Sequence, residues 1–428
     1  MKIVLLSGGS GKRLWPLSNE IRSKQFLKIV KSENGKIESM LQRVYRQIKS
    51  AGIDAEIAIA TRETQVEAIK NQLGDKVLIV VEPESRNTFP AIMLLAAYFH
   101  YELKCRDNET VVVLPIDPYV GDNYFQTLKK LDDAVQKNIA DIVLMGVVPT
   151  YPSEKYGYII PANDDKNIVR SFREKPPVAD AEKLIVEGAF WNCGVVAAKL
   201  SFLFKILEST IKCNSYLEVL EKYSQMEKNS FDYVVLEKAK SVGVIPYDGE
   251  WKDLGTWNTL TEVMDAFPIG DVKMSRDCVN THVVNELEIP IVVMGVRDMV
   301  VAASPDGILV ADKVQSSFIK KYVEDLNVRP MFEERAWGEY TVLNVAVDEL
   351  GNKAVTKKKC IRAGNVIEEM AHKKHSEVWT ILSGRAVINI NGRNHDALPG
   401  DTYTIPRNTL HSLKAVENTS IIEIQISG

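Results

Sequence analysis

The chain begins with a short apolar run, and a glycine-rich, basic turn follows it directly. The glycines of this turn are Gly8, Gly9 and Gly11, and its cations are Lys12 and Arg13. Glycines allow close approaches that residues with a Cβ resist, so several backbone N–H groups can point into one concavity. Such a concavity suits a polyanion such as a nucleoside triphosphate. The alternative is a plain structural turn.

The turn matches neither of the two common phosphate-binding patterns. A Walker A loop needs a glycine where Leu6 stands and Ser or Thr where Arg13 stands. A dinucleotide fingerprint needs its third glycine at the position of Leu14. The turn is therefore a phosphate-binding candidate of another kind.

Two aspartates could hold a divalent cation. Asp117 follows an apolar, strand-like run, and Asp253 lies in a loop-like segment before Gly255. Nucleotidyl transfer needs carboxylates for Mg²⁺, because the metal orients the reacting oxygens and offsets their charge. Each aspartate taken alone is also typical of a turn or a helix cap.

An adjacent pair of charges, Glu174 and Lys175, could bind a sugar phosphate. The carboxylate could orient a sugar hydroxyl, and the ammonium group could neutralise a phosphate. Adjacent opposite charges are also common on ordinary surfaces. The functional interpretation holds only if these segments and the aspartates meet in space.

Strand-like runs alternate with helical segments from residue 1 to about 146. The expected strands are 3–6, 56–60, 77–81, 111–114 and 142–145, and the expected helices lie near 38–50, 63–73, 90–103 and 124–137. This alternation predicts an α/β fold with a doubly wound parallel sheet, helices on both faces, and ligands at the carboxyl ends of the strands. The glycine turn, Glu82 and Asp117 all follow strands, so we expect them to converge on one rim.

The remaining chain becomes irregular and then rich in short strands. Val/Ile-rich runs between 290 and 310 predict small stacked strands, a β-helix-like appendage. Alternating apolar residues with turn signals at Asn391 and Pro399 predict a C-terminal all-β barrel. We therefore expect three regions, at residues 1–265, 266–330 and 331–428.

The composition, 45% apolar and 26% charged, is that of an ordinary globular protein. A net charge of -4 argues against nucleic-acid binding, and we expect the triplet Lys357–Lys359 to lie on a solvated strand face or loop. Five scattered cysteines without a CxxC pair fit reduced thiols. We find no signal peptide and no apolar run long enough to cross a bilayer, so we expect a cytoplasmic protein without a membrane partner.

A series of motifs runs in order along residues 1–260. They are Leu5–Ser18, Lys24–Phe26, Glu82–Thr88, Pro115–Asp117, Tyr156–Ile159, Phe172–Pro176, Trp191–Gly194, Phe231–Tyr233 and Trp251–Trp257. Together they resemble the bacterial mannose-1-phosphate guanylyltransferase (GDP-mannose pyrophosphorylase) family. The resemblance implies a nucleotidyltransferase that makes GDP-mannose and pyrophosphate from GTP and mannose 1-phosphate, by direct Mg²⁺-assisted attack.

The resemblance also implies roles for individual residues. The nucleotide would be held by Leu6, Ser7, Gly8, Gly9, Gly11, Arg13, Lys24, Glu82, Arg86, Asn87 and Asp117. Mg²⁺ would be held by Asp117 and Asp253. The sugar phosphate would lie against Gly157, Glu174, Lys175 and Asn192. The rate would depend on positioning and charge neutralisation by Arg13, Lys24, Asp117, Lys175 and Asp253.

The C-terminal segment carries His372, Glu377 and His411 at the spacing of the two cupin motifs. Imidazoles and a carboxylate can bind Zn²⁺ or a similar ion, although these could simply be polar strand residues. Long members of the resembled family have a mannose 6-phosphate isomerase cupin here. In this chain Met370 replaces a Gln ligand and His375 replaces an Arg. We expect a degenerate, shortened cupin, in assembly or sugar binding.

Other departures leave the sugar open. Glu154 and Lys155 stand where Thr-Gly is usual, beside the expected sugar pocket. The alternatives are a guanylyltransferase for another sugar 1-phosphate such as a heptose, a bifunctional enzyme that also isomerises mannose 6-phosphate, and a nucleotide-sugar sensor. A homo-oligomer, most simply a dimer, is expected in each case.

Overall fold

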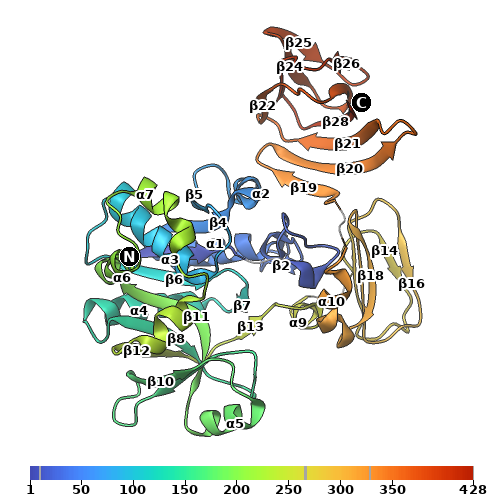
Figure 1. Cartoon of the computed structure of the whole chain (residues 1–428). Helices are drawn as coiled ribbons and strands as arrows, with labels where there is room; N and C mark the ends of the chain where they lie inside the picture. Colours follow the sequence, from blue (N-terminus) through green and yellow to red (C-terminus); the bar gives the residue numbers. More distant parts are fainter. Residues whose placement is uncertain (9–10, 265–267, 327–328, 428) are drawn as a thin grey trace. The chain divides into compact units, whose positions relative to one another are not determined.

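The computed structural model describes residues 1–8, 11–264, 268–326 and 329–427 (Figure 1). The chain forms two compact units. The first comprises Met1–Gly9, Val30–Val66 and Val77–Gly255, and the second comprises Ser10–Ile29, Glu67–Lys76 and Thr256–Gly428. Two short N-terminal segments therefore fold with the C-terminal half of the chain, and the three-region division stays a prediction.

A nine-stranded sheet forms the centre of the first unit. Its order is β10-β9-β11-β6-β1-β4-β5, with β8 paired to β11 and β12. The strands are β1 (Lys2–Leu6), β4 (Glu56–Arg62), β5 (Leu78–Glu82), β6 (Thr110–Pro115), β8 (Ile142–Val147), β9 (Tyr158–Pro161), β10 (Val169–Arg173), β11 (Phe190–Lys199) and β12 (Val242–Tyr247). Two ribbons lie outside it, β2 (Val30–Lys31) with β3 (Ile37–Glu38) and β7 (Pro118–Val120) with β13 (Trp251–Asp253). The predicted α/β class is confirmed.

The five strands predicted in residues 1–146 all run in one direction, as expected, but a later strand makes the complete sheet mixed. The neighbours β5, β4, β1 and β6 are parallel, but β11 runs antiparallel between β6 and β8. The prediction of a parallel sheet was made from residues 1–146 and did not include β11. The segment 195–198 of β11 is buried throughout, so this later strand fits the central position beside β6.

Helices cover both faces of the sheet, as predicted. Val4 belongs to the core that α3 shares, whereas its neighbours Ile3 and Leu5 point to the opposite face, and all three are fully buried. The helices of this part of the chain are α1 (Met40–Ser50), α2 (Glu63–Leu73), α3 (Thr88–Ala97), α4 (Asn123–Gln136), α5 (Val178–Val186), α6 (Leu200–Thr210), α7 (Tyr216–Glu221) and α8 (Phe231–Val234).

Short parallel strands form the appendage of the second unit. The strands are β14 (Val272–Met274), β15 (His282–Asn285), β16 (Ile291–Val293), β17 (Met299–Ser304) and β18 (Gly307–Asp312), and the short helices α9 (Trp257–Thr261) and α10 (Lys320–Val323) flank them in sequence. The pairs β14–β16 and β15–β17 are parallel, and β18 closes antiparallel on β17. Val283, Val293 and Val301 fill the space inside. The β-helix-like appendage is as predicted.

Two antiparallel sheets form the C-terminal barrel, in the orders β19-β20-β21-β28-β23-β26 and β22-β27-β24-β25. The strands are β19 (Phe332–Arg335), β20 (Gly338–Val347), β21 (Lys353–Ile361), β22 (Val366–Met370), β23 (Ser376–Ser383), β24 (Ala386–Ile390), β25 (Arg393–Ala397), β26 (Thr402–Ile405), β27 (His411–Ala415) and β28 (Thr419–Ser427). Trp379, Ile388 and Leu413 lie in its core. Asn391 and Gly392, with φ of 49° and 81°, make the predicted tight turn between β24 and β25.

The lysine triplet on β21 was expected to be a solvated strand face, and this expectation is wrong. Lys357 and Lys359 are 9% and 8% exposed, and both ammonium groups pair with the fully buried carboxylate of Glu423. Only Lys358 points outward, where it pairs with Glu288 at 2.6 Å. The side chains alternate because a strand has a period of two, and the expectation did not take this alternation into account.

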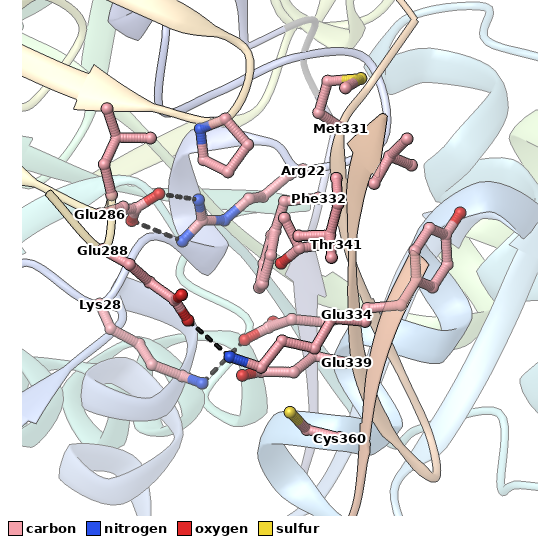
Figure 2. A pocket seen from close by; sticks show the side chains of 16 residues that line it. Arg22, Lys28, Glu286, Glu288, Met331, Phe332, Glu334, Glu339, Thr341 and Cys360 are labelled. Atoms are coloured by element: carbon pink, nitrogen blue, oxygen red, sulfur yellow. Dashed lines mark hydrogen bonds and ion pairs between the residues drawn. The ribbon is translucent and has the colours of Figure 1, made fainter. Parts of the chain in front are cut away.

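Ion pairs hold residues 22–28 within the second unit, around a cavity of about 590 Å³ (Figure 2). Both Nη atoms of Arg22 donate to Glu286, at 2.7 and 2.9 Å, and the guanidinium lies 4.8 Å from the centre of the Phe332 ring. Lys28 lies 2.7 Å from Glu334. These pairs anchor the segment that follows the glycine turn.

Glu286→Gln is therefore expected to destabilise the second unit by about 3 kcal/mol, because it leaves the buried Arg22 guanidinium without its counter-charge. Urea unfolding, with hydrogen exchange of residues 11–29 as a local probe, measures the loss. The matched control is Glu288→Gln in the same cavity. The Glu288 side chain is 84% exposed, so its loss should cost less than about 1 kcal/mol. Equal effects of the two variants would contradict the role of the Arg22 pair.

Candidate active site

The two aspartates that were predicted to hold a divalent cation lie on neighbouring segments of the backbone. Strands β7 and β13 pair antiparallel, with Pro118 opposite Asp253, and Asp117 directly precedes Pro118. A Cβ added to Gly255 would lie 3.3 Å from a carboxylate oxygen of Asp253, so this glycine allows the carboxylate to fold back along the chain. Both aspartates are half-buried. Carboxylates are the oxygen ligands that a hard cation such as Mg²⁺ prefers.

The glycine turn leaves β1 beside Asp117. Leu6 is paired with Pro115 on β6, so Ser7 and Gly8 emerge at the same edge of the sheet as Asp117. A Cβ on Gly8 would meet no atom of the described residues within 4 Å. Neighbouring protein atoms therefore do not explain this glycine, whereas close approach by a ligand would.

The residues of the turn that follow Gly8 do not belong to the described part of the first unit. Gly9 lies outside the described residues. Gly11, Arg13 and Lys24 belong to the second unit, and their contact with a nucleotide stays a prediction. A Cβ on Gly11 would come 2.9 Å from the Cβ of Ser18, so packing requires this glycine.

Glu82 and Arg86, predicted to hold the nucleotide, both have protein partners. Glu82 ends β5 and accepts a hydrogen bond from Tyr223 at 2.8 Å, and burial raises the pKa of its carboxyl group. The Nη atoms of Arg86 donate to Glu84 at 3.0 Å and to the carbonyl of Met226 at 3.1 Å. These contacts hold the end of β5 in place.

Asn87 caps α3. Its backbone has a φ of 73° and a ψ of -173°, a strained conformation that residues other than glycine rarely adopt, and its Oδ1 accepts a hydrogen bond from Thr88 N at 2.8 Å. The following helix is buried from Phe89 to its end. The structure thus gives Asn87 a structural role, and its nucleotide contact stays a prediction.

The four residues predicted to bind the sugar phosphate form one cluster. Asn192 N donates to Gly157 O at 2.8 Å, and a Cβ on Gly157 would come 2.5 Å from Oε2 of Glu174. Glu174 pairs in turn with Lys175. Lys175 has a φ of 44°, a strained conformation of the kind found at functional sites.

A bulge in β11 turns Asn192 toward this cluster. Pairing with β8 runs from Asn192↔Gly146 directly to Val196↔Leu144, so three residues of β11 lie opposite one. Within the bulge Gly194 has a φ of 75° and donates its N–H to Oδ1 of Asn192 at 3.2 Å. Bulges of this kind redirect side chains beside active sites.

A second cluster lies inside the C-terminal barrel, around Glu377. Its carboxylate lies 3.2 Å from Nε2 of His372, 3.1 Å from Nε2 of His375 and 3.4 Å from Nε2 of His411. The side chains of His372, Glu377 and His411 could all reach one ion. Sequence reasoning placed His375 outside the predicted ligand set, although it contacts the same oxygen as His372.

The two ring nitrogens of His411 indicate what this cluster can bind. It is 1% exposed, and its Nδ1 lies 2.9 Å from the carbonyl of Thr409, which requires the proton on Nδ1. Its Nε2 then faces the carboxylate of Glu377 without a hydrogen bond of good geometry. Two acceptors face each other stably only with a proton or a cation between them. The pKa of Glu377 is accordingly lowered and that of His411 raised, although burial opposes both charges.

Two family models match parts of the chain. Residues 2–268 match the model of the family described as nucleotidyl transferase. The chain belongs to this family. Residues 359–424 match the cupin domain family.

Curated relatives span nearly the whole nucleotidyl transferase chain. A mannose-1-phosphate guanylyltransferase of Salmonella montevideo is 28% identical over 99% of this chain and 94% of its own length. The alginate biosynthesis protein AlgA of Pseudomonas aeruginosa is 27% identical over 96% and 90%. A crystal structure titled mannose-1-phosphate geranyltransferase, from Thermus thermophilus, covers 76% of this chain and 99% of its own at 29% identity and a TM-score of 0.63. In the described part of the chain, no helix is both long and apolar enough to cross a membrane.

Sequence reasoning missed one residue of the sugar-phosphate cluster, Asp232. Its Oδ1 accepts a hydrogen bond from Nδ2 of Asn192 at 2.7 Å. Burial raises the pKa of Asp232, and the nearby charge of Glu174 adds to this, while Asn192 and Lys175 oppose it. The available signal was the ordered motif Phe231–Tyr233, to which no role had been given.

Aromatic rings join the segments that carry the site. Tyr156 lies 5.0 Å from Trp191 and 5.1 Å from Trp251, measured between ring centroids, and the two tryptophans are 6.1 Å apart. Each ring lies within two residues of a candidate site residue in the sequence. Edge-to-face and tilted packing of this kind stabilises a fixed arrangement, so the rings hold the sugar-phosphate cluster close to Asp253.

A stability measurement tests the environment of Asp232. Its folded pKa is raised, so the protonated form is the one that folding favours. That stabilisation is complete below the ordinary aspartate pKa of about 4 and is lost as the pH rises through the raised folded value. Asp232→Asn, which cannot ionise, should therefore melt higher than the native protein at pH 8, and the gain should shrink as the pH falls toward 4.5. Asp133→Asn, at an exposed position on α4, should show no such trend, and a pH-independent difference for Asp232→Asn would contradict the assignment.

Proposed function

We propose that the protein transfers GMP from GTP to mannose 1-phosphate, giving GDP-mannose and pyrophosphate. The observation that supports this proposal is the pairing of β7 with β13, which brings the backbone of Asp253 next to Pro118, the residue after Asp117, near the end of β1. The names of the full-length relatives support this choice of nucleotide and sugar.

Each cluster takes one part of the reaction. Lys175 neutralises the charge of the sugar phosphate. Glu174 accepts hydrogen bonds from sugar hydroxyls, and the Asn192 amide donates to them and accepts from them. The backbone around Gly8 approaches the triphosphate, with Arg13 and Lys24 as its cations. Holding both phosphates in line supplies most of the rate, because phosphoryl transfer depends on positioning and charge neutralisation.

Asp117 and Asp253 would hold Mg²⁺, whose oxygen-ligand preference their carboxylates meet. When bound, the ion offsets the negative charge that accumulates as two phosphates approach. An oxygen of the sugar phosphate forms a bond to the α-phosphorus of GTP, and the bond between that phosphorus and the bridging oxygen breaks. The electron pair leaves with pyrophosphate, and no proton acceptor is needed because the attacking oxygen is already ionised.

Two alternatives fit parts of the same geometry. A guanylyltransferase for another sugar 1-phosphate, such as a heptose, would use the same aspartates and Lys175. A nucleotide-sugar sensor would bind GDP-mannose without releasing pyrophosphate. A pyrophosphate-release screen that crosses four nucleoside triphosphates with several sugar 1-phosphates separates them. We further propose a cytoplasmic enzyme, consistent with the five free cysteines among the described residues, and a homodimer.

Asp253→Asn is expected to lower Mg²⁺-supported pyrophosphate release by at least about a hundredfold, because one carboxylate of the metal pair is lost. Thermal melting should remain within a few degrees of the native protein, because Asp253 is half-buried at the end of a short ribbon. The measurement is turnover of GTP and mannose 1-phosphate at saturating Mg²⁺. Near-native turnover would remove Asp253 from the proposed site.

We also propose that the barrel binds a divalent ion such as Zn²⁺ through His372, Glu377 and His411. The buried Nε2 of His411, which faces a carboxylate without a proper hydrogen bond, favours this site. Met370 on β22 lies opposite His411, and its thioether is a poor ligand for such an ion. We therefore propose that the barrel has a role in assembly or sugar binding. The alternative is isomerisation of mannose 6-phosphate.

Glu377→Gln is expected to abolish metal retention while leaving guanylyl transfer unchanged. Metal content of the purified full-length chain and the rise in melting temperature on adding Zn²⁺ measure the first effect. Pyrophosphate release measures the second. Undiminished metal content in the variant would reject the site, and a large loss of transfer would mean that the barrel is coupled to the first unit.

A further inference from the structure

We infer that Asp232 is a positioning residue for sugar selection: by holding the Asn192 amide in one orientation, it fixes which group that amide presents to the hexose of a hexose 1-phosphate. This inference rests on the proposed function and deepens it. It does not require Asp232 to touch the substrate.

The first step concerns the amide of Asn192. Its Nδ2 donates to Oδ1 of Asp232 at 2.7 Å, and its Oδ1 accepts from Gly194 N at 3.2 Å. An ionised carboxylate only accepts and a backbone N–H only donates. The two partners therefore define the orientation of the amide from opposite ends, and what remains for a ligand is the second N–H of Nδ2 and a lone pair of Oδ1.

The second step concerns the backbone beneath this amide. The N–H of Asn192 is fixed by Gly157 O at 2.8 Å, and Gly194 lies in the β11 bulge with a φ of 75°. The backbone of residue 192 is thus anchored independently of Asp232. Loss of the Asp232 carboxylate frees the side-chain amide without releasing the strand, so the effect should fall on ligand selection and leave the fold intact.

The third step concerns the free energy that is needed to keep the Asp232 carboxylate ionised. Asp232 lies near Glu174, a second carboxylate, and burial makes its ionised form unfavourable. An asparagine there would avoid that cost and keep an acceptor for Asn192. A charged group that the fold itself disfavours, directed at the amide of a ligand-binding cluster, is consistent with a role in function.

Asp232 is carried by an element separate from the rest of the cluster. It lies on α8, whose first turn is capped by Ser230, whereas Asn192 lies on β11 and Glu174 and Lys175 follow β10. Packing of α8 against the sheet therefore determines the orientation of a side chain on a strand. Such support from a second element is typical of sites held in one geometry.

The test compares Asp232→Ala, which removes the acceptor, with Asp232→Asn, which keeps it without its charge. In Asp232→Ala we expect KM for the sugar 1-phosphate to rise about tenfold to a hundredfold, as for a lost hydrogen bond to a charged group. KM for GTP should stay within about twofold. Asp232→Asn should recover part of the loss, and the preference of the native enzyme for mannose 1-phosphate over glucose 1-phosphate should narrow in Asp232→Ala.

A double-mutant cycle separates positioning from a structural effect. If Asp232 acts through Asn192, Asp232→Ala should add little to the loss already caused by Asn192→Ala. Asp133→Asn serves as the exposed control, with unchanged KM values. Additive effects, or equal rises in both substrates' KM, would overturn the inference.

The result also distinguishes this inference from the function on which it rests. If the native enzyme releases pyrophosphate but Asp232→Ala keeps its sugar KM and epimer preference, only the role of Asp232 is rejected. If the native enzyme turns over no sugar 1-phosphate with any nucleoside triphosphate, the proposed function and the inference both fail.

Discussion

The candidate metal site of the first unit depends on the pairing of two three-residue strands, β7 and β13. Strands β7 and β13 are only three residues long, yet their register places Asp253 opposite Pro118, the residue after Asp117, although the two aspartates are far apart in the sequence. A shift by one residue would send the Asp253 side chain to the other face, because side chains alternate along a strand. The aromatic contacts of Trp251 with Trp191 and Tyr156 oppose such a shift. The packing of the Trp251 ring thus helps to fix the register of the strand that carries Asp253.

The sugar-phosphate cluster places unfavourable features together. Lys175 has a left-handed backbone, β11 is interrupted by a bulge, and Asp232 is ionised only at a cost from burial. None of these stabilises the fold, and the surrounding sheet with its fully buried faces must offset them. Local strain concentrated at one edge of an otherwise regular sheet is the pattern expected of a site shaped for a ligand.

Periodicity was sufficient to predict the elements but not their neighbours. The helix expected near 63–73 is α2, and the strand expected at 56–60 is β4 with two more residues, because apolar spacing reports directly on burial. The position of β11 between β6 and β8 depends on pairing between distant segments, which no local pattern encodes. Lys357 and Lys359 show the same limit, since their burial depends on Glu423, a partner on another strand.

The site could be predicted only where a residue type carries its chemistry alone. Asp117, Glu174 and Lys175 could be proposed from their side-chain chemistry, and Asn192 from the ordered motifs that carry the family resemblance. Asp232 was missed because its contribution is made through Asn192, and a residue that acts through another has no signature at its own position. The same reasoning applies in the barrel, where His375 shares an oxygen of Glu377 with His372 only because the chain turns between them. Residues that position others are specified by three-dimensional contact, so a structure is the first place where they become visible.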